Sequence, residues 1–217
     1  MKNIAIIGAG GFGREVKTII DSINKINLSY TFIGFYDDGF KLGEIVNGYP
    51  ILGGVEDIGK IAEDCSIAIA VGDPKTKYAI LNKIKNNKID FPNIIHPNAL
   101  IADDFVEIGV GNIICAGCII TCNIAIKDFV ILNLMCTVGH DTTISSYSSF
   151  MPSVNISGEV FIEERVYVGT GAKIINQLRI GENTIVGAGA VVSKSLPGNC
   201  TAVGIPAKPI KFHNDQP

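Results

Sequence analysis

The chain has 217 residues, 47% of them hydrophobic, and a formal net charge of −3 at pH 7, so it can bury one large core or two small ones. The absence of a basic run argues against nucleic acid as a partner, and no apolar stretch reaches the roughly 18 residues that a membrane helix needs. A cytoplasmic protein is therefore expected.

The first third of the chain alternates short apolar runs with amphipathic segments. Strands are expected at residues 2–7, 30–35 and 67–71, and helices at residues 14–26, 55–62 and 75–86. The last helix should turn Tyr78, Leu81 and Ile84 inward. Strands that alternate with helices predict a parallel sheet covered by helices, which is a Rossmann-like α/β domain over residues 1–97.

A glycine turn joins the first expected strand to the first expected helix. Gly8, Gly10 and Gly13 satisfy G-x-G-x-x-G, a pattern that lets a phosphate approach the backbone at a helix N-terminus. The pattern is also compatible with NAD binding, or with a tight turn that binds nothing. Because the unit has only about 90 residues and no second mononucleotide half, a nucleotide attached to a smaller group fits better. Asp37 and Asp38 could bind a ribose hydroxyl or merely close the second strand.

The strongest pattern is a six-residue repeat that begins at Ile108. Fifteen consecutive hexads start with a large apolar residue, and the fifth position of each hexad is mostly small or apolar. The first positions are Ile108, Ile114, Ile120, Ile126, Leu132, Val138, Ile144, Phe150, Ile156, Ile162, Val168, Ile174, Ile180, Val186 and Val192.

A period of six fits neither a helix nor a flat strand, but it fits short strands separated by corners. Three hexads make one triangular coil, so residues 18 apart should stack at about 4.8 Å, the spacing of neighbouring strands. The repeat therefore predicts a left-handed parallel β-helix over residues 98–197, followed by a C-terminal loop and tail over residues 198–217. In this register Cys118 stacks on Cys136 in the core, and His140 points outward between Cys122 and Gly158.

Three cysteines have a spacing that can indicate a metal site. Cys115, Cys118 and Cys122 form C-x-x-C-x-x-x-C. The repeat places Cys118 in the core, however, so we predict reduced structural thiols and no metal.

The whole chain resembles one family of hexapeptide-repeat acyltransferases, the sialic-acid O-acetyltransferase (NeuD) family. Its members include N-acetyltransferases that act on UDP- or GDP-linked 4-amino sugars. The resemblance rests on the glycine turn, the Asp37-Asp38 pair, the hexads and three short segments. These segments are Ile95-His96-Pro97, Gly139-His140-Asp141 and the ending Ala202-Val203-Gly204-Ile205-Pro206-Ala207-Lys208-Pro209-Ile210.

The resemblance implies a homotrimer with acetyl-CoA in the groove between adjacent β-helices. It implies that His140 is a general base, a task that suits a neutral imidazole, and that Asp141 orients its ring. The residues implied to bind acetyl-CoA are Ser149, Thr170, Ala188 and Lys208. The residues implied to bind the nucleotide sugar are Gly10, Gly11, Phe12, Asp37, Asp38 and Gly72.

Several alternatives remain open at this point. The acceptor could be the amine of a nucleotide-linked amino sugar or a hydroxyl of sialic acid. His140 could be an ordinary surface histidine on a non-catalytic scaffold, and the glycine turn could serve a nicotinamide-dependent enzyme. A zinc carbonic anhydrase of the same fold is excluded, because His96 and His213 cannot join His140 on neighbouring coils.

Overall fold

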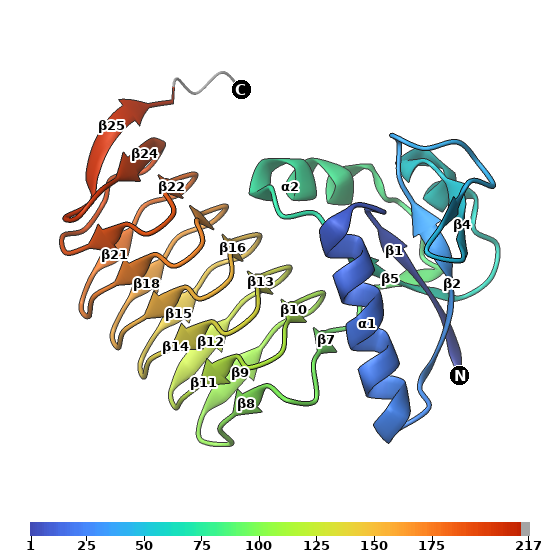
Figure 1. The fold of residues 1–217 in the computed structure, drawn as a ribbon, viewed down its shortest axis with the longest axis horizontal. Coiled ribbons are helices and arrows are strands. Elements are labelled where there is room, and N and C mark those ends of the chain that lie inside the picture. The colour runs from blue at the N-terminus through green and yellow to red at the C-terminus, as the bar shows by residue number, and fades with distance from the viewer. Residues whose placement is uncertain (214–217) are drawn as a thin grey trace.

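The computed structural model describes residues 1–213 and contains an α/β unit beside a triangular β-helix (Figure 1). The fold class that the sequence predicted, a Rossmann-like unit followed by a left-handed parallel β-helix, is confirmed. Residues 214–217, the end of the predicted C-terminal tail, lie outside the described residues. No helix in the described range is long and apolar enough to cross a bilayer.

The N-terminal unit is a six-stranded sheet in the order β3-β4-β2-β1-β5-β6. Its pairs are parallel except for the short β3–β4 hairpin. The strands are β1 (Lys2–Ile7), β2 (Tyr30–Tyr36), β3 (Ile45–Val46), β4 (Tyr49–Gly53), β5 (Cys65–Ile69) and β6 (Ile89–Asp90). The helices are α1 (Gly11–Ile26), the 3₁₀ helix η1 (Val55–Lys60) and α2 (Pro74–Lys83). Every predicted element is present within a few residues, whereas β3, β4 and β6 were not predicted.

The β-helix consists of three parallel sheets whose strands are two to five residues long. The β7 sheet contains β7 (Ile94–Ile95), β10 (Ile113–Ile114), β13 (Ile131–Leu132), β16 (Ser149–Phe150), β19 (Tyr167–Val168), β22 (Ile185–Val186), β24 (Cys200–Val203) and an antiparallel edge strand, β25 (Lys208–Phe212). The β8 sheet contains β8 (Leu100–Ile101), β11 (Ile119–Ile120), β14 (Thr137–Val138), β17 (Asn155–Ile156), β20 (Lys173–Ile174) and β23 (Val191–Val192). The β9 sheet contains β9 (Val106–Ile108), β12 (Ile124–Ile126), β15 (Thr143–Ile144), β18 (Phe161–Ile162) and β21 (Arg179–Ile180).

The core of the β-helix follows the hexads. The first residue of each hexad is the last residue of a strand, and partners in neighbouring strands are 18 residues apart along most of the β-helix. Cys118 and Cys136 are both buried in this core, as predicted. Polar fifth positions are buried too, and each hydroxyl has a backbone acceptor: Thr142 donates to the Ser157 carbonyl and Thr184 to the Pro197 carbonyl. These bonds offset the cost of burying a hydroxyl among apolar side chains.

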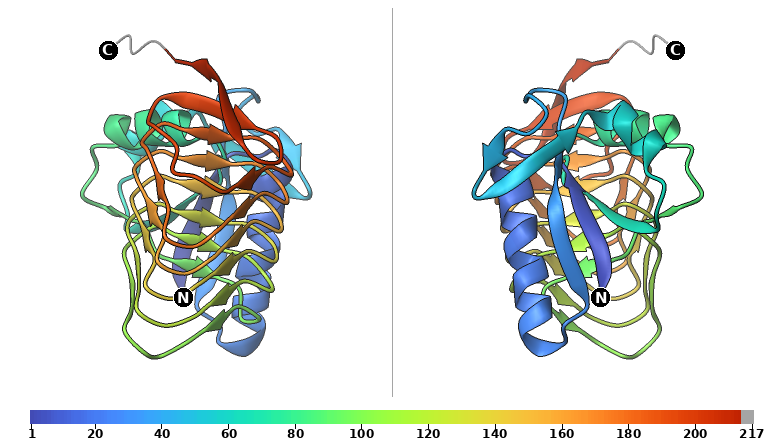
Figure 2. Two further views of the ribbon diagram at one scale, coloured as in Figure 1. Left: turned by 90° about the vertical axis from the view of Figure 1, so that its left-hand side faces the viewer. Right: turned by 90° about the vertical axis from the view of Figure 1, so that its right-hand side faces the viewer.

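The N-terminal unit covers the outer face of the β7 sheet. Val16 and Ile20 of α1 share one buried cluster with Ile94, Ile113 and Ile131, which point outward from β7, β10 and β13. Strand β7 already belongs to the β-helix, so the β-helix begins a few residues before the predicted start at residue 98. Figure 1 shows the two units side by side, with the β7 sheet toward the N-terminal unit, and in the two views of Figure 2 one unit lies in front of the other.

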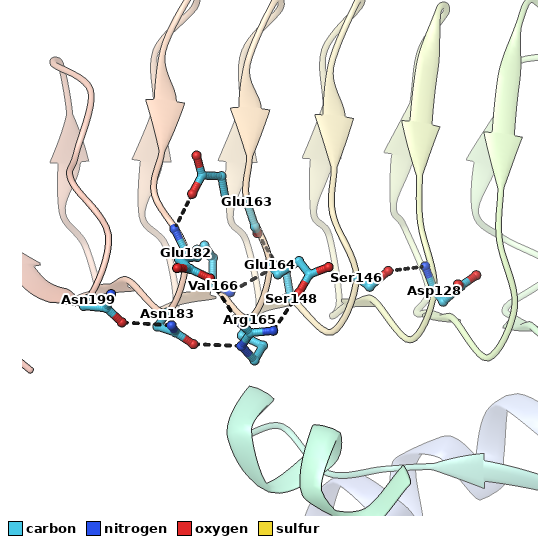
Figure 3. A network of polar contacts seen from close by, with 10 residues as sticks. All are labelled: Asp128, Ser146, Ser148, Glu163, Glu164, Arg165, Val166, Glu182, Asn183 and Asn199. Carbon is cyan, nitrogen blue, oxygen red and sulfur yellow. Dashed lines mark hydrogen bonds and ion pairs between the residues drawn. The ribbon is translucent and has the colours of Figure 1, made fainter. Parts of the chain in front are cut away.

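Helix α2 faces the β-helix differently from the sequence prediction. Tyr78 was expected on the inner face, but it is 40% exposed. Its ring makes an edge contact with Tyr147, with centroids 5.1 Å apart, and lies below the Arg165 guanidinium. Figure 3 shows Arg165 at the corner that faces α2, within a polar network that includes Glu182 and Asn183. A tyrosine can therefore stay at the edge of the interface, where one end of its ring meets solvent.

The residue that α2 buries instead is Lys77. Its side chain is 1% exposed, and its Nζ donates to the Ser149 hydroxyl at 2.9 Å and to the Ser148 carbonyl at 3.5 Å. Burial lowers the pKa of Lys77 from 10.5 to about 7, with Asp73 opposing the shift. The amine therefore connects the two units, and the free energy lost by burying it in its charged form depends on pH.

We expect Lys77→Met to remove a pH-dependent part of the stability. Between pH 7 and 10.5 the unfolded chain binds more protons at this lysine than the folded chain, so the free energy of unfolding rises with pH across that window. Urea unfolding at several pH values should show a flatter profile for Lys77→Met. Lys75→Met, at an exposed position of the same helix, should keep the original slope. Equal slopes in the two variants would contradict this interpretation.

Candidate active site

The glycine turn sits between β1 and α1, and its glycines have different tasks. Gly8 has a φ of 99°, which glycine adopts without strain. A Cβ atom on Gly13 would lie 1.8 Å from the Gly8 carbonyl oxygen, so only glycine lets α1 approach β1 this closely. Gly10 and Gly11 are exposed, and a Cβ atom on either would meet nothing within 4 Å. The space beside these two glycines is open to a ligand.

The first turn of α1 presents backbone donors to this space. Gly11, Phe12 and Gly13 precede the first intrahelical bond, which runs from the Arg14 N–H to the Gly10 carbonyl. No side chain caps the helix, and Phe12 is half-buried against the core of the unit. Free N–H groups at a helix N-terminus favour an anion such as a phosphate.

Asp37 and Asp38 both bind backbone groups. The Asp37 carboxylate accepts hydrogen bonds at 2.8 Å from the N–H groups of Ala9 and Gly39, and Asp38 accepts one at 2.8 Å from Val55. Asp37 therefore ties the end of β2 to the glycine turn, in agreement with the alternative that this pair closes a strand. The contact of either residue with a ribose stays a prediction.

The His140–Asp141 pair lies at the corner between β14 and β15, which we call the β8/β9 corner. The Nδ1 atom of His140 lies 2.7 Å from the Asp141 carboxylate, and the His140 side chain is 57% exposed. Hydrogen bonds from His140 and from Asn123 lower the pKa of Asp141. With Nδ1 donating to Asp141, the Nε2 atom is left as a proton acceptor.

A second set of predicted site residues gathers at the corner between the β7 and β8 sheets, the β7/β8 corner. Thr170 and Ala188 lie there on neighbouring coils, both exposed, and neither N–H has an acceptor among residues 1–213. Lys208 begins β25, the second strand of the C-terminal hairpin. This hairpin lies beside them, because the Gly187 N–H donates to the Ala202 carbonyl of β24. Exposed, unpaired N–H groups on successive coils suit the amide carbonyls of an extended ligand arm.

The glycine turn and the β7/β8 corner lie on the same side of the chain. Gly72 follows β5, the neighbour of β1, so it lies at the same edge of the N-terminal sheet as the glycine turn. A Cβ atom on Gly72 would lie 3.7 Å from the Met151 side chain, which belongs to the β7/β8 corner. His140 and Asp141 lie at the β8/β9 corner, opposite the sheet that the N-terminal unit covers. One chain alone therefore does not bring all the predicted site residues together.

Ser149 is not available for the predicted cofactor contact. It is fully buried in β16 beneath α2, and its hydroxyl accepts the hydrogen bond from Lys77. The hexad pattern indicates only that Ser149 points out of the β-helix, and it cannot show that another unit covers that face.

The three cysteines of the C-x-x-C-x-x-x-C segment point in different directions. Cys115 packs against the N-terminal unit, Cys118 lies in the β-helix core and Cys122 is half-buried. Burial raises the pKa of Cys115 to about 12, which keeps its thiol protonated. Within residues 1–213, no three cysteine, histidine or acidic side chains are grouped as metal ligands.

Sequence reasoning missed Asn123. Its Nδ2 donates to the Asp141 carboxylate at 3.0 Å from the coil below. The signal was present, because Asn123 is 18 residues before Asp141 and the repeat stacks such residues.

Comparison with known proteins agrees with this architecture. Residues 3–84 match the PglD N-terminal domain, and residues 159–194 match the bacterial transferase hexapeptide repeats. A GDP-perosamine N-acetyltransferase from Escherichia coli O157:H7 is 31% identical over 226 residues, covering 97% of this chain and 97% of that protein.

Two solved structures align over nearly the full length. PerB from Caulobacter crescentus, in complex with CoA and GDP-perosamine, has a TM-score of 0.88 and 29% identity, covering 97% of this chain and 98% of that one. The acetyltransferase domain of PglB from Neisseria gonorrhoeae FA1090, in complex with acetyl coenzyme A, has a TM-score of 0.87 and 31% identity, covering 96% of this chain and 99% of that one.

The fold and the exposed histidine–aspartate corner define a hexapeptide-repeat acyltransferase with an N-terminal α/β unit. Within this class, the chain belongs to the family of sugar acetyltransferases that includes GDP-perosamine N-acetyltransferase. The family resemblance found in the sequence is thereby confirmed.

Proposed function

We propose that the protein transfers an acetyl group from acetyl-CoA to the amine of a nucleotide-linked 4-amino sugar. The observation that carries this proposal is the exposed imidazole of His140, whose Nδ1 atom is held by Asp141 at 2.7 Å. The full-length similarity to a GDP-perosamine N-acetyltransferase favours a GDP-linked amino sugar as the acceptor. A cytoplasmic location would suit such an activated sugar.

The active site forms between two chains of a homotrimer. The glycine turn and the β7/β8 corner lie on one side of a chain, while His140 lies at the β8/β9 corner, so a neighbouring chain supplies the histidine. Adjacent β-helices that meet through these two corners enclose a groove between them. In that groove the Thr170 and Ala188 N–H groups and the Lys208 side chain bind the CoA arm.

The nucleotide sugar binds at the glycine turn. The N–H groups of Gly11 and Phe12 bind its phosphate, and the open space beside Gly10 and Gly11 lets the phosphate approach the backbone. Gly72, at the same edge of the sheet, borders the sugar. Asp37 contributes through the Ala9 N–H, which it holds in the turn.

His140 acts as the general base in the transfer step. The Nε2 atom takes a proton from the acceptor nitrogen as that nitrogen attacks the thioester carbonyl of acetyl-CoA. A C–N bond forms, the C–S bond breaks, and the CoA thiolate leaves and takes up the proton from the His140 imidazolium, which restores the neutral base. Asp141 accepts the hydrogen bond from Nδ1 and stabilises the imidazolium that this proton transfer creates.

A thiol-release assay with acetyl-CoA tests the proposal. The acceptor panel contains GDP-perosamine, a UDP-4-amino sugar, CMP-sialic acid and free sialic acid, and mass spectrometry identifies the product. We expect turnover of a nucleotide-linked amino sugar with one added acetyl group on nitrogen. Turnover of a sialic acid alone would replace the proposed acceptor with a hydroxyl. Absence of turnover, together with no acetyl-CoA binding by calorimetry, would favour a non-catalytic scaffold.

A further inference from the structure

The His140–Asp141 pair is supported by the coil below it. Residues at the fourth hexad position of the β8/β9 corner stack 18 apart, and they include Asn123, Asp141, Glu159 and Gln177. Asn123 and Asp141 both have a left-handed backbone, with φ values of 56° and 57°, so their side chains leave the corner in the same direction. The Asn123 amide donates to one Asp141 oxygen at 3.0 Å while the other oxygen lies 2.7 Å from His140 Nδ1. Asn123 therefore fixes the orientation of the carboxylate.

The coil above supports the imidazole ring itself. Gly158 stacks on His140, and a Cβ atom on Gly158 would lie 2.5 Å from Nε2 and 2.6 Å from Cε1 of the ring. The ring therefore lies directly against the Gly158 backbone. Any side chain at position 158 would force the ring to turn away, since the ring is half-exposed and free to move outward.

From this geometry we infer that Asn123 and Gly158 are positioning residues for the His140–Asp141 pair. Asn123 acts from the coil below through Asp141, and Gly158 acts from the coil above by leaving room for the ring. Together they keep His140 in one orientation, with Nδ1 toward Asp141 and the far edge of the ring beside the Gly158 backbone. The inference rests on the proposed role of His140 as the base.

The variants must remove side chains without straining the backbone. Asn123→Gly removes the amide and keeps the left-handed conformation, and Gly158→Ala adds one methyl group beside the ring. A matched control is Gln177→Gly. Gln177 has the same backbone conformation and donates to Glu159 at 3.2 Å in the same column, without touching His140.

The first readout needs no substrate. The chain has three histidines, so nitrogen-15 NMR spectra of the imidazoles can be assigned by comparison with His140→Ala. In the wild type we expect the neutral His140 ring to carry its proton on Nδ1. Asn123→Gly and Gly158→Ala should shift the ring signals toward a mixture of tautomers, and Gln177→Gly should leave them unchanged. Unchanged His140 signals in both test variants would overturn the inference, whether or not the proposed reaction is found.

Kinetic measurements then distinguish a loss of His140 orientation from a general loss of structure. We expect Asn123→Gly to lower kcat by about three- to tenfold, with little change in the KM for acetyl-CoA, because only the orientation of the base changes. In an Asp141→Gly background the same substitution should have almost no effect, since Asn123 acts through Asp141. Equal losses in both backgrounds would overturn the role assigned to Asn123, and a wild-type rate for Gly158→Ala would overturn that of Gly158.

Discussion

Replacement of His140 by alanine is expected to lower acetyl transfer by roughly 10²-fold or more, the scale on which loss of a general base is felt. The side chain is 57% exposed and its polar partner is the neighbouring Asp141, so folding does not depend on it. The thermal midpoint and acetyl-CoA binding should therefore match the wild type. The loss should appear in kcat, because the imidazole is needed in the transition state.

A second histidine provides the control for this variant. His213 accepts or donates a hydrogen bond with the Thr201 hydroxyl at the C-terminal hairpin, away from the β8/β9 corner. His213→Ala should keep most of the activity. A fully active His140→Ala protein would remove the histidine from the mechanism, and an unfolded one would mean that the ring has a structural role.

The second large effect is expected at the glycine turn, where alanine at position 13 should affect stability and alanine at position 11 should affect substrate binding. Gly13→Ala places a Cβ atom 1.8 Å from the Gly8 carbonyl oxygen, so either α1 or β1 must move. We expect a loss of about 2 kcal/mol or more in the free energy of unfolding of the N-terminal unit. Urea unfolding followed by circular dichroism measures this loss.

Gly11→Ala is the matched variant for substrate binding. The new methyl group meets nothing within 4 Å in the free protein, so stability should be unchanged. It would, however, occupy the space through which a phosphate approaches the N–H groups of α1, and the KM for the nucleotide sugar should rise by about tenfold or more. A wild-type KM for Gly11→Ala would contradict phosphate binding at this turn.

Most of the architecture could be predicted because it follows from local patterns. The hexads specify strands, corners and an 18-residue register, and that register alone places Cys118 in the core and His140 outside it. The glycine turn could also be predicted, since a strand, three spaced glycines and an amphipathic helix follow one another in the chain. The reaction class was predicted from the family resemblance, because the periodicity of the sequence does not specify a reaction.

The contacts between the two units could not be predicted. Hydropathy indicates that Lys77 should be exposed and Tyr78 buried, but α2 turns the lysine toward the β-helix and leaves the tyrosine at the edge. Ser149 points away from the β-helix core, as its position predicts, yet α2 covers it. Each of these outcomes depends on which surfaces meet, and a single segment of sequence does not carry that information.

The most direct test of the shared active site is a hybrid of two defective proteins. His140→Ala lacks the base, and Gly11→Leu blocks the glycine turn with a larger side chain in the open space. In a trimer where the turn of one chain faces His140 of its neighbour, about a quarter of the sites in randomly mixed trimers contain two intact halves. Co-expression of the two variants should therefore restore acetyl transfer to about a quarter of the wild-type rate, far above either variant alone. Activity no higher than the mean of the two parents would place the whole site within one chain and contradict the account.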